Sequence, residues 1–299
     1  MSRFLQSLRS GQVLLMDGAM GTELQRAGIG AGECYELWNL TRPDVVRGIH
    51  QAYVAAGAEC LLTHTFQANP VALARHGCVE HLDAIQRAAL DLARAAAGPE
   101  RFILYDIGPV GSEEAANAAL VERLLPDLPR VDAILLETFS DPLVFFLARQ
   151  CQIVAWNEPL PVLVSLTYQR DAQGRLCTWS GQPPEWFALQ ARQYDIAALG
   201  VNCGKDIAMP DIIEIIRRYR QVTDLPLFAR PNAGAPTRHD DRWHYPSTPE
   251  QLANHLPSLL EAGVSMVGGC CGATPAHIAA FQRVIAEWNT RRVRNGSVS

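Results

Sequence analysis

The stretch VSMVGGCC, residues 264–271, contains the two features on which the fold and the chemistry of this chain depend. It begins with an apolar run that includes Val264 and Val267, and it ends in two adjacent cysteines, Cys270 and Cys271. A short, nearly continuous apolar run is typical of a strand that is buried on both faces of a parallel sheet. The stretch therefore predicts a buried strand whose carboxyl end carries two thiols.

Seven earlier runs have the same character, and segments with helical patterning separate them. The runs are VLLMD (13–17), CLLTHTF (60–66), FILYDIG (102–108), AILLETF (133–139), VLVSLTY (162–168), AALGVNC (197–203) and LPLFARP (225–231). Eight buried strands that alternate with helices predict one closed (β/α)₈ barrel of the TIM type, a single domain over residues 1–299. The alternative, an open doubly wound sheet, is disfavoured because no glycine-rich phosphate-binding motif follows the first run.

Two of the intervening segments carry clear helix boundaries. Thr41 is the expected N-cap of a helix over residues 41–57. Thr248 is the expected N-cap over residues 248–263, where Pro249 takes the first helical position. These signals support the alternation of strand and helix.

Composition excludes several classes of function. The net charge of −5 and the isoelectric point near 5.9 argue against a nucleic-acid surface. No apolar stretch approaches the roughly 20 residues of a membrane span, and the first residues do not resemble a signal peptide. We therefore expect a cytoplasmic protein with reduced thiols, in which the eight cysteines are metal ligands, reactive groups or core residues.

In a (β/α)₈ barrel the functional residues gather at the carboxyl ends of the strands. Polar residues and cysteines stand at or just beyond the ends of the predicted strands: Asp17, residues 64–67, Asp106, Glu137, Thr167, Cys203, Asn232, Cys270 and Cys271. We expect these residues to share one mouth of the barrel.

Three of the cysteines can converge there. Cys203 ends the sixth run, Cys270 and Cys271 end the eighth, and one strand separates the two. Three thiolates with an open fourth position are typical of catalytic zinc, and soft sulfur ligands favour Zn²⁺ over Mg²⁺ or Ca²⁺. The flanking glycines would let the backbone bend so that both thiols face inward: Gly268, Gly269 and Gly272.

Two other interpretations of these cysteines stay open at this point. Cys203 can be a core residue beside an incidental pair, or Cys270 and Cys271 can form a redox disulfide. A zinc ion with three thiolate ligands is a weak Lewis acid, which suits alkyl transfer to sulfur better than hydrolysis. The remaining cysteines are expected to be packing residues: Cys34, Cys60, Cys78, Cys151 and Cys177.

Seven motifs in this chain resemble those of one family. They are DGAMGTEL (17–24), AGAECLLTHTFQAN (56–69), LLETFSD (135–141), SGQ (180–182), GVNCG (200–204), RPNAG (230–234) and GGCCGATPAHI (268–278). In their order and coverage they resemble the homocysteine S-methyltransferases, which include the homocysteine-binding domain of methionine synthase and the betaine–homocysteine methyltransferases. The combination of GVNC with GGCCG is the most specific part of the resemblance.

The resemblance implies a zinc-bearing (β/α)₈ barrel with the zinc site at the carboxyl ends of the strands. It implies that Cys203, Cys270 and Cys271 are the protein ligands and that the sulfur of homocysteine is the fourth ligand. It also implies that Asn202 orients the loop that carries Cys203.

The resemblance further implies where the amino acid part of homocysteine binds. Asp17 and Glu137 would hold its amino group, and backbone N–H groups around Gly18 and Ala19 would receive its carboxylate. Considered as residues alone, Asp17 can instead cap the following helix, and Glu137 can be one partner of a buried ion pair. His64 either faces the pocket or packs in the core.

The implied activity is zinc-dependent transfer of a methyl group to L-homocysteine, which gives methionine. Methionine synthase continues into folate-, cobalamin- and activation domains, whereas this sequence ends about 20 residues after GGCCGATPAHI. We therefore expect no cobalamin bound to this chain, and we favour the sulfonium donors S-methylmethionine and S-adenosylmethionine. Candidates for an aromatic wall around the sulfonium are Phe66, Phe139, Tyr168 and Trp179.

Three alternatives remain for the function. The chain can methylate another thiol or a selenol, or it can exchange methyl groups with a separate corrinoid- or folate-binding protein. It can also be a non-catalytic protein that binds zinc or thiols.

Overall fold

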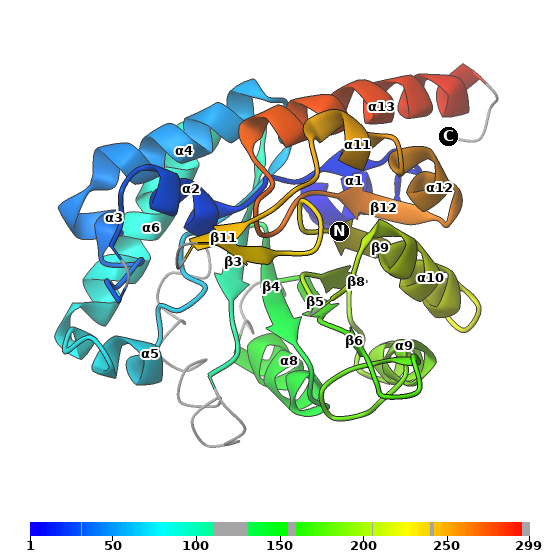
Figure 1. The fold of residues 1–299 in the computed structure, drawn as a ribbon, viewed down its shortest axis with the longest axis horizontal. Helices are drawn as coiled ribbons and strands as arrows, with labels where there is room; N and C mark the ends of the chain where they lie inside the picture. Colours follow the sequence, from blue (N-terminus) through cyan, green and yellow to red (C-terminus); the bar gives the residue numbers. More distant parts are fainter. Residues whose placement is uncertain (31, 111–130, 155–159, 205, 240–241, 295–299) are drawn as a thin grey trace.

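The computed structural model describes residues 1–30, 32–110, 131–154, 160–204, 206–239 and 242–294. Eight parallel strands form one sheet in the order β1-β12-β9-β8-β5-β4-β3-β2, which surrounds the centre of the molecule in Figure 1. The strands are β1 (Leu14–Leu15), β2 (Cys60–Leu62), β3 (Phe102–Ile107), β4 (Ala133–Phe139), β5 (Val162–Leu166), β8 (Ala198–Asn202), β9 (Leu227–Arg230) and β12 (Val264–Val267). Each of them lies within one of the eight predicted runs.

The two end strands of the sheet also meet. A parallel bridge joins Met16 to Cys60. The N–H of Glu59 donates to the carbonyl of Leu15 at 2.7 Å, and the N–H of Asp17 donates to the carbonyl of Cys60 at 3.0 Å. These bonds curl the sheet into a barrel and confirm the predicted (β/α)₈ architecture.

Helices surround the barrel. Those described are α1 (Arg3–Arg9), α2 (Met20–Arg26), α3 (Trp38–Thr41), α4 (Pro43–Ala55), α5 (Pro70–Ala74), the 3₁₀ turn η1 (Val79–His81), α6 (Leu82–Ala97), α8 (Leu143–Val154), α9 (Pro184–Gln193), α10 (Met209–Arg220), α11 (Pro249–Ala253), α12 (Leu256–Glu261) and α13 (Pro275–Arg294). Within the described ranges, no helix has both the length and the apolar character needed to cross a membrane.

The core has an inner and an outer part because side chains alternate between the two faces of each strand. Inward-facing residues such as Leu104, Leu135 and Met266 fill the barrel. Outward-facing residues pack against the helices in a larger cluster. Helix α1 closes the N-terminal end of the barrel by inserting Phe4 and Leu8 into the inner cluster.

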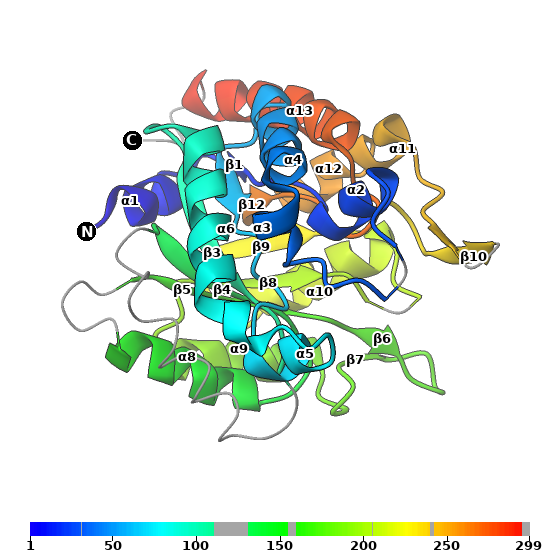
Figure 2. The ribbon, with the colours of Figure 1, turned by 90° about the vertical axis from the view of Figure 1, so that its left-hand side faces the viewer.

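Two small hairpins were not predicted. They are β6 (Gln169–Arg170) with β7 (Leu176–Cys177), and β10 (Thr237–His239) with β11 (Arg242–His244). Figure 2 shows both hairpins at the end of the barrel opposite to α1. They follow β5 and β9 and therefore lie around the mouth where the strands end.

Two details of the helix predictions are wrong. Thr41 is the last residue of α3, and Arg42 is the N-cap of α4, because a residue before a proline is disfavoured from helical geometry and Pro43 begins the helix. The segment after Thr248 forms two helices, since Pro257 cannot donate a hydrogen bond to Ala253 in a continuous helix. Thr248 itself is confirmed as an N-cap, and its hydroxyl accepts from the N–H of Gln251.

Candidate metal centre

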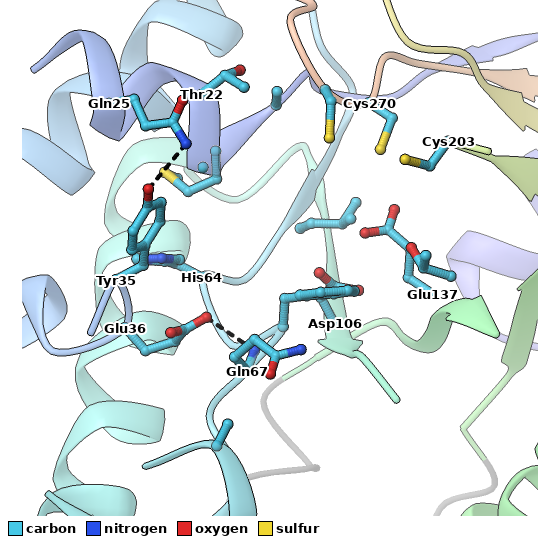
Figure 3. Close-up of a pocket in the computed structure, with 18 of the residues that line it drawn as sticks. Thr22, Gln25, Tyr35, Glu36, His64, Gln67, Asp106, Glu137, Cys203 and Cys270 are labelled. Carbon is cyan, nitrogen blue, oxygen red and sulfur yellow. Dashed lines mark hydrogen bonds between the residues drawn. The ribbon is translucent and has the colours of Figure 1, made fainter. Parts of the chain in front are cut away.

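Three cysteine sulfurs lie together at the mouth of the barrel. The Sγ atoms of Cys203, Cys270 and Cys271 all lie within 4.8 Å of one another. Cys203 directly follows β8, Cys270 and Cys271 lie in the loop after β12, and β9 stands between these two strands. Figure 3 shows the sulfurs of Cys203 and Cys270 pointing toward one another at one side of a cavity. The spacing permits all three sulfurs to bind one metal ion.

Cys203 is held in an unusual backbone conformation. Its φ angle is 56°, in the left-handed region that residues with a Cβ rarely adopt. Its N–H donates to the carbonyl of Arg230 at 3.4 Å, and the N–H of Cys270 donates to the carbonyl of Pro231 at 2.8 Å. Strand β9 thus anchors both cysteine loops. Strain of this kind, roughly 1–3 kcal/mol, persists where the surroundings fix a functional side chain.

The glycines around the cysteine pair act differently from the prediction. Only Gly272 has a positive φ angle, 80°, and so provides a bend. A Cβ on Gly268 would lie 2.7 Å from the carbonyl oxygen of Asp17, and one on Gly269 would lie 2.3 Å from the Cβ of Ala273. Glycine is needed at these two positions because neighbouring segments of the chain leave no room for a Cβ atom.

Two asparagines contact the sulfurs. Asn232 donates through Nδ2 to the sulfur of Cys203 at 3.6 Å, and its buried Oδ1 has no hydrogen-bond partner among the described residues. Asn202 donates through Nδ2 to the sulfur of Cys270 at 3.7 Å. Both amides therefore face an electron-rich sulfur group.

Asn202 was expected to orient the loop of Cys203, but its side chain contacts other elements. Its Nδ2 donates to the hydroxyl of Thr138 at 2.7 Å, and its Oδ1 accepts from the hydroxyl of Ser165 at 2.6 Å and from the N–H of Thr138 at 3.2 Å. Thr138 has a φ angle of 65°. Asn202 therefore ties the strained end of β4 to β5 and to Cys270.

The three thiols are chemically coupled. Hydrogen bonds from Cys270 and Cys271 lower the pKa of Cys203 to about 3. The bond to Cys203 raises the pKa of Cys270 to about 11. One thiolate supported by two thiols is a donor set that a soft metal ion can complete by displacing two protons.

A buried charge network lies beside the sulfurs. Arg230, at the end of β9, is 3% exposed; it donates to Asp17 Oδ1 at 3.2 Å and forms an ion pair with Glu137. Burial raises the pKa of Asp17, to about 7, although Arg230 opposes this shift. Burial also raises the pKa of Glu137, to about 7. Of the alternatives left open for Glu137, the ion pair is therefore present, and Arg230 is the partner.

The expected carboxylate site around Gly18 and Ala19 is only partly available. Both residues line the cavity. The N–H of Ala19 already donates to the carbonyl of Ala273 at 3.0 Å, so this group has a partner within the protein. The carbonyl of Gly18 accepts from Arg230 at 3.3 Å. Asp17 is not the N-cap of α2, because that position belongs to Ala19.

A cavity of about 580 Å³ extends from the sulfurs toward β2 and the start of α5. Of the four aromatic residues predicted to surround the donor, only Phe66 is among the described residues that line it. The prediction is wrong for Tyr168 and Phe139, which lie in the outer core cluster, and Trp179 is 65% exposed outside the cavity. The aromatic residues that do line it are Tyr35, Phe66, Trp243 and Tyr245.

Further polar residues face the same space. His64 lines the cavity, hydrogen-bonds through Nδ1 to Asn39 Oδ1 at 3.1 Å, and is kept neutral because burial lowers its pKa to about 3. Glu36 accepts from the N–H of Gln67 at 2.9 Å. Cys34 also lines the cavity, where burial raises its pKa to about 12, so that it stays a thiol.

Sequence reasoning placed Asp106 at the mouth without a specific role and did not single out Arg230, although Arg230 also stands near the end of a predicted strand. Arg230 belongs to the motif RPNAG, which was used only for the resemblance. A charged residue that ends a buried apolar run is a usable signal, because such a charge needs a partner inside the barrel. Tyr35 and Tyr245 lie in loops and Trp243 lies in the hairpin strand β11, and the sequence around these three residues carries no comparable signal.

Comparisons with known proteins agree with this geometry. A family model described as homocysteine S-methyltransferase matches residues 14–285. Methionine synthases of Mycobacterium tuberculosis and Mycobacterium leprae are 31% and 30% identical over 94% and 95% of this chain. The chain spans about a quarter of their length, 25% in each case.

Among solved structures, the homocysteine methyltransferase MmuM from Escherichia coli in its metallated form superposes with a TM-score of 0.73 at 27% identity. The match covers 94% of this chain and 99% of MmuM. The family match, the relatives and the shared barrel together show that this chain belongs to the homocysteine S-methyltransferase family of enzymes.

Proposed function

We propose that this chain transfers a methyl group from a sulfonium donor to the thiol of L-homocysteine and so produces methionine. The observation that carries the proposal is the group of three sulfurs within 4.8 Å, placed in one cavity with Asp17 and Glu137. A thiol substrate with an amino group at its other end matches both parts of that cavity. The location that suits free thiols is the cytoplasm, which we keep as part of the proposal.

The residues present fit a zinc ion. Three thiolates are a preferred donor set for Zn²⁺, and Asn232 donates through Nδ2 to the sulfur of Cys203 at 3.6 Å, a contact that supports a thiolate at this position. We propose Cys203, Cys270 and Cys271 as the protein ligands. A bound zinc ion would lower the pKa of the homocysteine thiol and keep it as a nucleophilic thiolate at neutral pH.

We propose that Asp17 and Glu137 bind the amino group of homocysteine. Arg230 already lies between these carboxylates, so an incoming ammonium group would share them with its guanidinium group. Burial keeps the pair in a low dielectric, where each charge–charge contact is strong. Gly18, at the start of the loop before α2, remains the proposed contact for the carboxylate of the substrate.

The chemistry is a direct displacement. The homocysteine sulfur attacks the methyl carbon, the new S–C bond forms, and the old C–S bond breaks with its electron pair moving to the donor sulfur. The sulfonium thereby becomes a neutral thioether, and the thiol proton leaves to solvent. No general base is required of the protein, whose task is to hold the two sulfurs and the methyl carbon in line.

A second candidate donor is a separate corrinoid- or folate-binding protein. The observation that favours it is the 31% identity to a methionine synthase that is about four times as long as the matched region. In that case the open mouth between the hairpins would receive the partner's methyl group. A sulfonium donor needs no such partner and is therefore our first choice.

One assay separates these candidates. Purified protein loaded with zinc is incubated with homocysteine and, in turn, S-methylmethionine, S-adenosylmethionine, methylcobalamin or methyltetrahydrofolate, and methionine is quantified. We expect methionine with a sulfonium donor and none after zinc is removed by a chelator. Turnover with methylcobalamin alone would favour the corrinoid partner, and full activity of the metal-free protein would refute the proposed mechanism.

A further inference from the structure

Asp106 is a buried carboxyl group that neither the metal centre nor the proposed amino-group site uses. It lies in β3, is 4% exposed and lines the same cavity as the sulfurs. Its Oδ1 is buried and has no hydrogen-bond partner within the described residues. A carboxylate without a partner inside a protein is costly, so its presence in a cavity points to a ligand.

The charges around Asp106 do not balance. Asp17 and Glu137 share the guanidinium group of Arg230, and the side chain of Asp106 makes no ion pair with it. Arg230 is the one buried arginine among the described lining residues, whereas the buried acids there also include Glu36. Burial and the neighbouring Glu137 raise the pKa of Asp106, although Arg230 opposes this shift, so a positively charged ligand beside Asp106 would favour its ionised form.

Asp106 lies across the barrel from the sulfurs and beside one carboxylate of the site proposed for homocysteine. The sulfurs and Arg230 belong to the arc of β12, β9 and β8, whereas Asp106 belongs to β3 on the opposite arc, next to β4, which carries Glu137. Figure 3 shows Asp106 between the sulfur group and Gln67. A donor that attacks in line must approach the substrate sulfur from this open side.

An apolar aromatic surface lies next to Asp106. The N–H of Gly108, two residues further on, donates to the carbonyl of Phe66 at 2.9 Å. A Cβ on Gly108 would lie 2.7 Å from the Phe66 ring, so this ring packs directly on the end of β3. An aromatic ring beside an unpaired carboxylate is a suitable environment for a sulfonium group, which carries charge on an apolar body.

We propose that Asp106 is the counter-ion of the cationic methyl donor and thereby selects a sulfonium over a neutral or anionic donor. The inference rests on the proposed methyl transfer but assigns a residue that the metal and homocysteine sites do not contain. Phe66 and Asp106 would contact the sulfonium together, one through its ring and the other through its charge.

The chemistry predicts a distinctive kinetic signature. The donor carries a full positive charge when it binds and loses that charge as the methyl group moves to the homocysteine sulfur. Asp106 therefore stabilises the bound donor more than the transition state or the thioether product. Removal of its charge should raise KM for the donor and leave kcat unchanged or slightly increased.

The test compares Asp106→Asn with the wild type in kinetics and in binding. We expect KM for S-methylmethionine to rise about tenfold or more, which corresponds to the loss of one charge-assisted contact, while KM for homocysteine changes less than about twofold. Asp44→Asn, on the exposed surface of α4, is the matched control because it removes one negative charge outside the cavity. It should behave as the wild type.

Binding is measured by calorimetry with two probes of the same shape. They are S-methylmethionine and 2-amino-5-methylhexanoic acid, in which a neutral CH replaces the sulfonium sulfur. Wild type should bind the cation about tenfold more tightly or better, and Asp106→Asn should bind both probes about equally. Asp106→Glu, which keeps the charge, should retain the preference for the cation. Removal of an unpaired buried charge should not lower thermal stability, so Asp106→Asn is expected to fold.

The outcomes separate this inference from the proposed function. A rise in KM for homocysteine alone would overturn the assignment of Asp106 to the donor, as would an equal loss of affinity for both probes. If no donor gives methionine while wild type still prefers the cationic probe and Asp106→Asn does not, the proposed reaction fails and the role of Asp106 stands. If methionine forms only from a neutral or anionic donor, the role of Asp106 is wrong and methyl transfer stands.

Discussion

The two ends of the barrel contain different types of side chain, apolar at the N-terminal end and charged or thiol-bearing at the mouth. At the N-terminal end, Phe4 and Leu8 of α1 fill the barrel with apolar side chains that are 0% and 2% exposed, and Phe4 packs edge-on against Phe102 with ring centroids 5.3 Å apart. At the mouth, a similar depth of burial is found for the charged residues Asp17 and Arg230, which are each 3% exposed, and the three cysteines beside them are half-buried.

Part of the backbone strain also lies at the mouth. Thr138 and Cys203 have φ angles of 65° and 56° there, whereas the positive φ of Asp195 before β8, 51°, belongs to a residue type that adopts the left-handed region more readily. Buried charges without full pairing and left-handed backbone reduce stability, whereas tight apolar packing raises it. The N-terminal end therefore stabilises the fold and allows the mouth to keep an arrangement that suits binding and chemistry. Substitutions at the two ends should have separable effects.

The largest effect is expected at the sulfurs. Cys271→Ala removes one of three ligands, so metal binding and methionine formation should fall together, by at least about a thousandfold in kcat/KM, or roughly 4 kcal/mol. The far-ultraviolet circular dichroism spectrum should be unchanged, because Cys271 contributes little to either core. Metal content by mass spectrometry and the methionine assay measure the two losses.

The control for that substitution is Cys151→Ala, which removes a buried thiol from α8, outside the cavity. It should keep its metal and its activity. Normal activity of Cys271→Ala would show that the three sulfurs do not act as one metal centre. It would also contradict the assignment of the chemistry to the mouth of the barrel.

At the N-terminal end, we expect a substitution to reduce stability and leave activity unchanged, and this effect should be smaller than that at the sulfurs. Phe4→Ala leaves a cavity among side chains that close the barrel, and it should lower the free energy of unfolding by about 3 kcal/mol. Its kcat/KM, measured well below the unfolding temperature, should match that of the wild type. Urea titration measures the first quantity and the methionine assay the second.

Leu5→Ala, on the same helix at a half-buried position, should lose clearly less stability. If Phe4→Ala lowered kcat/KM in the folded protein, the two ends would be mechanically coupled and the division of tasks would be wrong.

The difference between the ends also explains what the sequence could predict. The eight strands were identifiable because parallel strands buried on both faces appear as apolar runs. The run 133–139 coincides with β4, whereas other runs extend past the observed strand by up to four residues, as 264–271 does beyond β12. The convergence of Cys203 with Cys270 followed from the rule that strand ends share one mouth. This prediction required only the order of the strands in the barrel and no knowledge of side-chain contacts.

The unpredicted features depend on side-chain contacts between distant segments. Nothing in the sequence joins Arg230 to Asp17 and Glu137, which are 213 and 93 residues away. Tyr168 stood at a strand end like Phe66, yet it faces outward and hydrogen-bonds to Tyr219 at 2.7 Å, because the direction of a side chain at the end of a strand depends on the register of the barrel. The local sequence pattern therefore identified the strands and helices, but it did not identify which side chains contact one another.

The smallest effect concerns a buried polar group near the mouth. His50 of α4 is 0% exposed, and neither ring nitrogen has a hydrogen-bond partner in the described structure. Burial lowers its pKa from 6.5 to about 4. The unfolded chain therefore binds more protons than the folded chain between these pH values, so the stability that neutral His50 allows is complete above pH 6.5 and is lost as pH falls toward 4.

His50→Leu should remove this part of the acid sensitivity, because leucine does not titrate and suits an apolar position. Between pH 7 and pH 5 the wild type should lose about 1 to 2 kcal/mol more unfolding free energy than the variant, as the shift in pKa requires. Urea midpoints at the two pH values measure the difference. Equal acid sensitivity in both proteins would mean that His50 is solvated or has a hydrogen-bond partner in solution. Near the mouth, buried polar groups without partners would then be confined to the residues that line the cavity. A difference of the expected size would show that such groups also occur in the helices outside the barrel, at His50 of α4, and not only at cavity residues such as Asp106.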